Sequence, residues 1–238
     1  VLFRSKTGIS CSQFNKTVLS SPWVHEFEKS LANGGSELSP VDWQVDLGNY
    51  CNSACLFCNP FASSKLATEW KKLGLINELP SSSWVDDDQS LDNFIEALHQ
   101  SPKTRYIHFL GGETVITPAF KKILEKLIRF NFNQTVAIGF TTNLTVWDQS
   151  IVDLLCQFKE VNLGMSIESL DSINDYVRWP STIDDVCKIR DRWIQVGRDY
   201  NWLMQLRITP NVLTIGRLIP MFDFAMKNNI IIESCNFI

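Results

Sequence analysis

Three of the seven cysteines of this 238-residue chain lie within residues 50–59, in the segment YCNSACLFCN. Cys51, Cys55 and Cys58 have the spacing C-x3-C-x2-C, and thiolates spaced in this way on one loop can converge on zinc or on an iron–sulfur cluster. A structural zinc site needs a fourth ligand, usually from a second pair of residues, and the remaining cysteines and histidines show no such spacing. A four-iron cluster held by three thiolates leaves one iron free to bind a small molecule, which is a catalytic arrangement.

Polar residues that could act with these cysteines follow several apolar runs further along the chain. Gly111 and Gly112, in LGGET, allow a backbone to come close to a ligand, and the adjacent Glu113 offers an acceptor for an ammonium group. Ser166 and Glu168 share one face if the segment alternates as a strand does. A plain turn remains open as the alternative for residues 141–143, and a surface ion pair for Arg178.

The hydrophobic periodicity predicts strands that alternate with helices over residues 41–238. Such alternation predicts parallel strands joined by right-handed crossovers, with functional residues at the carboxyl ends of the strands. An open doubly wound sheet and part of a (β/α) barrel both fit this pattern. The predicted strands are 41–47, 105–110, 135–140, 161–167, 202–209 and 230–238. The predicted helices are 65–73, 90–100, 117–130, 147–158, 181–197 and 214–229, the last with Pro220 marking a kink or a late start.

The cysteine motif after the first predicted strand, followed one βα unit later by Gly-Gly-Glu, resembles the radical S-adenosylmethionine (SAM) superfamily. The resemblance implies an α/β fold, a partial (β/α)6 TIM-like barrel with parallel strands. It also implies a 4Fe-4S cluster on Cys51, Cys55 and Cys58, with SAM bound to the open iron. Reductive cleavage of SAM would give a 5′-deoxyadenosyl radical that abstracts hydrogen from a substrate. A flavodoxin- or ferredoxin-type protein would supply the electron.

The same resemblance assigns roles in SAM binding to eight residues. It places Phe57 against the adenine, Gly111, Gly112 and Glu113 at the amino group, and Asn143 nearby with a looser role. Ser166 and Glu168 would bind ribose hydroxyls, and Arg178 would bind the carboxylate. This chain has Thr114 where the family usually has Pro, and Glu168 where it usually has Asp. The pattern names no catalytic acid or base.

Composition narrows the class of protein further. The chain is 45% hydrophobic, enough to build a core, and its net charge of −4 without a basic stripe gives no strong nucleic-acid signal. No apolar run approaches the ~20 residues of a membrane helix, and no signal peptide is visible. An odd number of scattered cysteines favours a reducing, cytoplasmic setting.

The predicted organisation is an N-terminal extension or linker over residues 1–40 and a core barrel over residues 41–238, truncated after its sixth strand. The segments CNSACLFCNPFASSK and DYVRWPSTIDDV resemble most closely the radical SAM proteins that carry a twitch auxiliary-cluster domain, which would follow the last strand. The predicted substrate is a ribosomally made peptide. The alternatives are a radical SAM enzyme that acts on a small molecule or a nucleoside, and a non-enzymatic zinc or Fe-S binding interaction module.

Overall fold

The computed structural model describes residues 40–80 and 84–234. The chain divides into two compact units, Val1–Pro40 and Val41–Ile238, and every element described below belongs to the second. The predicted extension over residues 1–40 therefore lies outside the described residues, apart from Pro40. Within the described part, none of the helices is both long enough and apolar enough to cross a lipid bilayer.

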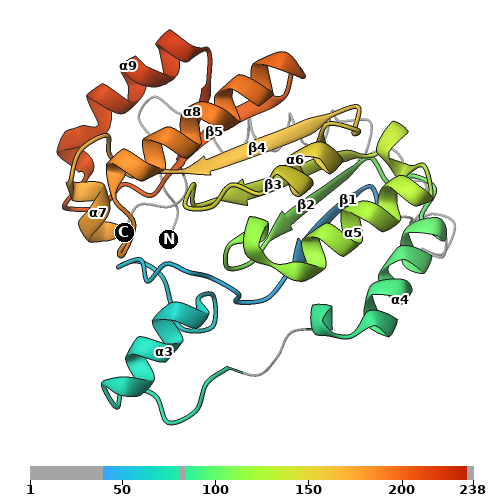
Figure 1. The fold of residues 1–238 in the computed structure, drawn as a ribbon, viewed down its shortest axis with the longest axis horizontal. Coiled ribbons are helices and arrows are strands. Elements are labelled where there is room, and N and C mark those ends of the chain that lie inside the picture. The colour runs from blue at the N-terminus through green and yellow to red at the C-terminus, as the bar shows by residue number, and fades with distance from the viewer. Residues whose placement is uncertain (1–39, 81–83, 235–238) are drawn as a thin grey trace, which may run out of the picture. The chain divides into compact units, whose positions relative to one another are not determined.

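Six parallel strands form one sheet in the order β1-β2-β3-β4-β5-β6, so each strand pairs with its neighbours in sequence (Figure 1). This confirms the predicted α/β class and is consistent with a partial TIM-like barrel. The strands are β1 (Asp42–Asp46), β2 (Tyr106–Leu110), β3 (Ala137–Thr142), β4 (Val161–Ser166), β5 (Leu203–Ile208) and β6 (Ile231–Ser234).

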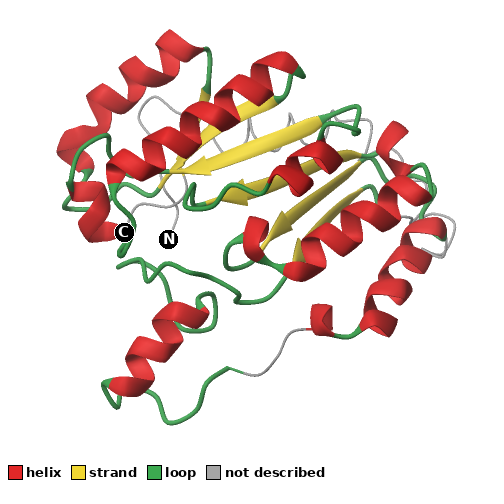
Figure 2. Ribbon diagram, in the orientation of Figure 1, coloured by secondary structure: helices red, strands yellow, loops and turns green. Residues whose placement is uncertain are grey.

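The helices connect successive strands, and α5, α6 and α8 cross in front of the strands in Figure 2. The α-helices are α3 (Ser64–Lys72), α4 (Asp88–His99), α5 (Pro118–Arg129), α6 (Gln149–Leu155), α7 (Ile173–Val177), α8 (Ile183–Asp199) and α9 (Leu218–Asn228). Short 3-10 turns are η1 (Trp84–Asp86), η2 (Thr114–Ile116), η3 (Phe132–Gln134) and η4 (Ile215–Arg217).

Most boundaries differ from the sequence prediction by one to four residues, and three of these differences have a clear local reason. β3 begins at Ala137, two residues later than predicted, because η3 occupies the preceding turn. α8 continues past Gly197 to Asp199, because Gly197 is a packing position: a Cβ there would meet the sulfur of Met204. Pro220 lies in the first turn of α9, so the late start is the correct interpretation.

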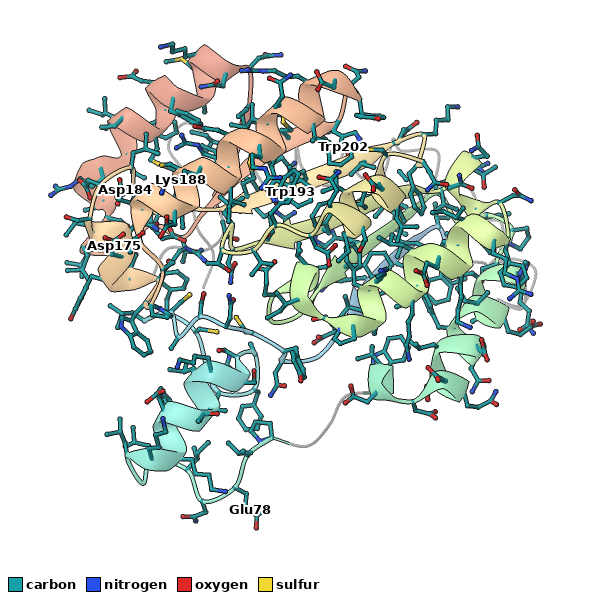
Figure 3. All side chains as sticks on the ribbon, viewed as in Figure 1. Glu78, Asp175, Asp184, Lys188, Trp193 and Trp202 are labelled. Atoms are coloured by element: carbon teal, nitrogen blue, oxygen red, sulfur yellow. The ribbon has the colours of Figure 1, made fainter. Side chains whose placement is uncertain are left out.

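A continuous aromatic cluster joins the sheet to these helices. Phe120 of α5 packs against Phe109 and Phe140 of the sheet, with ring centroids 5.3 and 5.7 Å apart. Trp193 of α8 contacts Phe140 and also Trp202, which precedes β5, and both tryptophans are labelled in Figure 3. These rings are buried and fix the helices on one face, so the opposite face of the sheet is left for polar side chains.

Candidate active site

Cys51, Cys55 and Cys58 line one cavity of about 350 Å³. Its other walls come from the ends of four further strands. They include Leu110 of β2, Thr142 of β3, Ser166 of β4 and Thr209, which follows β5. The cavity therefore lies at the carboxyl edge of the parallel sheet, where an α/β fold places its functional residues.

The cysteine loop is held on one side by α3. Ser63 Oγ caps α3 by accepting from Leu66 N and donates to the carbonyl of Ser53 at 2.6 Å. Ser64 Oγ lies 3.1 Å from both the backbone nitrogen and the carbonyl oxygen of Cys51. These two serines were not identified from the sequence, because their partners are backbone groups that only the fold brings near.

The loop is held on two further sides by α7 and by the residues after β3. Ala54 N donates to the carbonyl of Trp179, and Leu56 N to that of Val177, so the loop runs beside the end of α7 (Figure 1). Asn143 Nδ2 donates to Asn52 Oδ1 at 2.9 Å and to Ser53 Oγ at 3.0 Å. Asn143 thus lines the cavity and also anchors the cysteine loop.

The two glycines of the Gly-Gly-Glu turn bring that turn against the chain that leads into the cysteine loop. Gly111 has a φ of +134°, and a Cβ there would lie 2.5 Å from the carbonyl oxygen of Gly48. A Cβ on Gly112 would overlap the carbonyl of Tyr50, and Gly112 N donates to Gly48 O at 2.7 Å. Only glycine allows this approach, which places Glu113 beside the cysteines.

The Glu113 carboxylate is buried and accepts three hydrogen bonds from the chain. Oε1 accepts from Val115 N and Thr142 Oγ1, and Oε2 accepts from Asn143 N. A carboxylate has about four acceptor positions, so one remains on Oε2. Burial nevertheless raises the pKa of Glu113 to about 7, because the three donors offset only part of the desolvation. A cationic ligand beside it would restore the ionised form.

Arg178 reaches the same cavity, but its partner is one that the sequence did not indicate. Its side chain forms a buried ion pair with Glu168, through Nε at 3.2 Å and Nη2 at 2.5 Å. Glu168 Oε2 also accepts from Thr209 N at 2.6 Å, and Glu168 is not among the residues that line the cavity. Ser166 does line the cavity, so the structure separates two side chains that strand alternation places together.

Two aspartates that precede Arg178 in the sequence have other contacts. Asp171 pairs with Arg217 at 2.8 Å, and Asp175, labelled in Figure 3, accepts from Ile183 N at the start of α8. The surface ion pair considered for Arg178 is therefore replaced by a buried one.

The three thiols can act as ligands of an iron–sulfur cluster, although they carry no charge while no metal is bound. Burial raises the pKa of Cys51 to about 11 and also raises the pKa of Cys55 and Cys58, so the metal-free thiols are protonated at neutral pH. Ser53 N donates to Cys51 Sγ at 3.5 Å, and Arg178 Nη1 lies 3.9 Å from Cys55 Sγ. Both donors would stabilise thiolates once a metal displaces the protons.

The spacing of the ligands is also compatible with a cluster. Across residues 40–80 and 84–234, no three His, Cys, Asp or Glu side chains are grouped to hold a single metal ion. A 4Fe-4S cluster does not require such convergence, because each thiolate binds a different iron. The three cysteines on one cavity wall, with N–H donors to two of their sulfurs, therefore fit the group.

A polar layer lies on the inner face of the sheet below the cavity. Arg207 of β5 lies flat across Gly164 of β4, where a Cβ would come within 2.8 Å of its side chain. Its Nη1 donates to Thr141 Oγ1 of β3 at 2.9 Å and lies 3.2 Å from His108 Nε2 of β2. One arginine thus contacts residues of three neighbouring strands, and Arg207 and Thr141 both line the cavity.

This arrangement fixes the protonation of His108. An arginine can only donate, so Nε2 accepts and the ring proton is on Nδ1, which lies 2.9 Å from Tyr106 Oη. Burial and the charge of Arg207 lower the pKa of His108 to about 4. His108 is therefore a neutral, hydrogen-bonded interior residue and not a free base.

Of the predicted site residues, all but Glu168 line the one cavity. They are Cys51, Cys55, Phe57, Cys58, Gly111, Gly112, Glu113, Asn143, Ser166 and Arg178. Together with the parallel sheet, they define a cofactor-binding α/β fold with a thiolate loop at the mouth of a partial barrel.

Comparison with known families and structures gives this class its name. Residues 45–209 match the Radical SAM superfamily, and the chain belongs to that superfamily. Its members are enzymes that use a 4Fe-4S cluster and SAM, and these are the cofactors of this chain. The alternative of a non-enzymatic zinc or Fe-S module is thereby overturned.

Three known proteins illustrate what this chain is similar to. The sporulation killing factor maturation protein SkfB of Bacillus subtilis (strain 168) is 25% identical over 186 residues, which cover 73% of this chain and 39% of SkfB. SuiB of Streptococcus suis, solved with its precursor peptide SuiA, matches 100% of this chain and 48% of its own, with a TM-score of 0.62 and 19% identity. Tagged anSMEcpe with bound AdoMet matches 84% and 50%, with a TM-score of 0.64 and 17% identity. This chain spans half or less of the length of each.

Proposed function

We propose that this chain is the catalytic barrel of a radical SAM enzyme that modifies a ribosomally made peptide. The observation that carries the proposal is the single cavity at the carboxyl edge of the sheet, which brings together the three cysteines, the Gly-Gly-Glu turn, Ser166 and Arg178. The peptide substrate is supported by two of the similar proteins, of which one is a maturation protein and the other was solved with its precursor peptide.

In this proposal the residues of the chain bind and orient the cofactors. Cys51, Cys55 and Cys58 would hold the cluster, and the cofactors, when bound, would supply the radical chemistry for hydrogen abstraction. The remaining acceptor position of Glu113 takes the SAM ammonium, and Arg178 offers its guanidinium to the carboxylate.

The other residues of the cavity wall complete the SAM site and the space for the substrate, which is called the reaction chamber below. Phe57 lies in the cysteine loop for the adenine, and Ser166 faces the cavity for the ribose. Thr141, Arg207 and Thr209 lie on the part of the wall formed by β3 and β5, where a substrate would face the radical. A flavodoxin- or ferredoxin-type protein supplies the electron, and free thiols suit a cytoplasmic setting. The twitch-domain likeness stays a prediction.

The test is anaerobic reconstitution followed by reduction in the presence of SAM. We expect about four irons per chain and release of 5′-deoxyadenosine in the wild type, with both lost in Cys55→Ala. Cys187→Ala is the matched control, because Cys187 lies on α8 away from the cavity wall and should leave both unchanged. Full iron content in Cys55→Ala would contradict the ligand assignment.

A further inference from the structure

The guanidinium of Arg178 contacts two groups that carry negative charge in the working protein. Its Nε and Nη2 donate to Glu168, while Nη1 points to the sulfur of Cys55 at 3.9 Å. The Arg178 side chain is 10% exposed and that of Glu168 is 1% exposed, so water screens neither contact well. Arg178 is thus a buried cation that lies against a proposed cluster ligand.

Several contacts keep Arg178 in this place. Glu168 is itself fixed by Thr209 N at 2.6 Å, which ties the pair to the end of β5. The ring of Phe57, between the second and third cysteines, lies 5.2 Å from the guanidinium carbon. The side chain is therefore held in position before any ligand binds, and its charge has a fixed location relative to Cys55.

A fixed cation beside a ligating sulfur acts on the electron affinity of a cluster. Hydrogen bonds and charges near the sulfurs are among the factors that set the reduction potential of an iron–sulfur centre. Reduction adds one negative charge to the cluster, and a positive charge close to a ligand stabilises that added charge. Glu168 opposes this effect, but Arg178 donates directly toward the sulfur and its charge acts on Cys55 more strongly than that of Glu168.

We propose that Arg178 raises the reduction potential of the cluster through its contact with Cys55, and that Glu168 is the positioning residue that holds Arg178 there. This inference rests on the proposed function, because it requires the cluster on Cys51, Cys55 and Cys58. It gives Arg178 a role that does not depend on SAM, and it gives Glu168 a role outside the ribose contact that the sequence suggested.

The experiment is a redox titration of the reconstituted chain without SAM, in which dithionite delivers one electron to each cluster and electron paramagnetic resonance follows the reduced form. Arg178→Gln should keep the iron content of the wild type and shift the midpoint potential to more negative values. Arg178→Lys keeps the charge and should restore part of the shift. A midpoint unchanged in Arg178→Gln would overturn the inference.

The chain offers a matched control in a second arginine–cysteine contact. Arg190 Nη1 lies 3.1 Å from Cys187 Sγ on α8, and the Arg190 side chain is also buried, but neither residue lines the cavity. Arg190→Gln should leave the midpoint unchanged. A shift as large as that of Arg178→Gln would show that any buried arginine has this effect, and would overturn the assignment to Arg178.

A second variant is needed if Arg178→Gln binds the cluster poorly because Glu168 is left buried without its ion-pair partner. Arg178→Met with Glu168→Leu removes both charges together and leaves neither unpaired. It should also shift the midpoint to more negative values, because the charge that acts more strongly on Cys55 has gone. A wild-type chain that binds no four-iron cluster would overturn the proposed function and this inference together, whereas a loaded wild type with unshifted variants overturns the inference alone.

Discussion

Replacing Glu168 with alanine should destabilise the fold more than any other single truncation at the mouth of the barrel. The change leaves the buried Arg178 guanidinium without its ion-pair partner and Thr209 N without its acceptor. Burial disfavours the charged form of Arg178, but Glu168, Cys55 and Cys51 together outweigh it, so the pKa of Arg178 is raised. Removing one partner of a buried pair costs about 3–5 kcal/mol, because the other charge stays desolvated. We expect a loss of that size in the free energy of unfolding.

The assay is urea unfolding followed by tryptophan fluorescence, with two companion variants. Glu168→Gln keeps a neutral acceptor for Arg178 and Thr209 and should lose clearly less than Glu168→Ala. The double variant Glu168→Leu with Arg178→Met should also lose less than Glu168→Ala, because no charge is stranded. A loss below about 1 kcal/mol for Glu168→Ala, as for a surface ion pair, would refute the reasoning.

Two further predictions concern Glu113 and Gly139. The pKa of Glu113 is about 7, and a bound ammonium needs the ionised carboxylate. The SAM affinity of the wild type divided by that of Glu113→Gln, measured by equilibrium dialysis, should therefore rise roughly tenfold from pH 6 to pH 8. A ratio that stays constant would remove Glu113 from the site. Gly139→Ala should cost about 1–3 kcal/mol in urea unfolding, since its Cβ would overlap Tyr106 Oη and lie 2.5 Å from His108 Nδ1. Gly216→Ala, where a Cβ meets nothing within 4 Å, is the control, and an equal effect there would count against this packing argument.

The parallel direction of the strands could be predicted from the sequence because each βα unit carries its own hydrophobic period, whereas their order followed from the family resemblance, since a doubly wound sheet fits the same period. Parallel strands place all their carboxyl ends on one edge, so the residues after β1, β2, β3 and β4 were expected near one another before any contact was known. The cysteine loop, the Gly-Gly-Glu turn and Ser166 do line one cavity. α7 was not predicted, because five residues are too few to show a helical period.

Side-chain partners were harder to predict than positions. Ser166 and Glu168 alternate to the same face only while the strand continues, and β4 ends at Ser166, so the rule does not reach Glu168. A surface ion pair was the alternative for Arg178, whereas its partner is the buried Glu168, ten residues away on the other side of α7. The serines that hold the cysteine loop bond to backbone groups, which carry no sequence signal.

The close approach of Arg207 to Gly164 has a consequence for the size of the reaction chamber. Arg207 lines the cavity while its Nη1 contacts Thr141 and His108, so one long side chain covers part of the cavity wall. A shorter residue at position 207 would enlarge the chamber, and a bulkier one at position 164 would displace the arginine side chain. Substrate size can thus be adjusted at two positions that contact neither the thiolate loop nor the Gly-Gly-Glu turn.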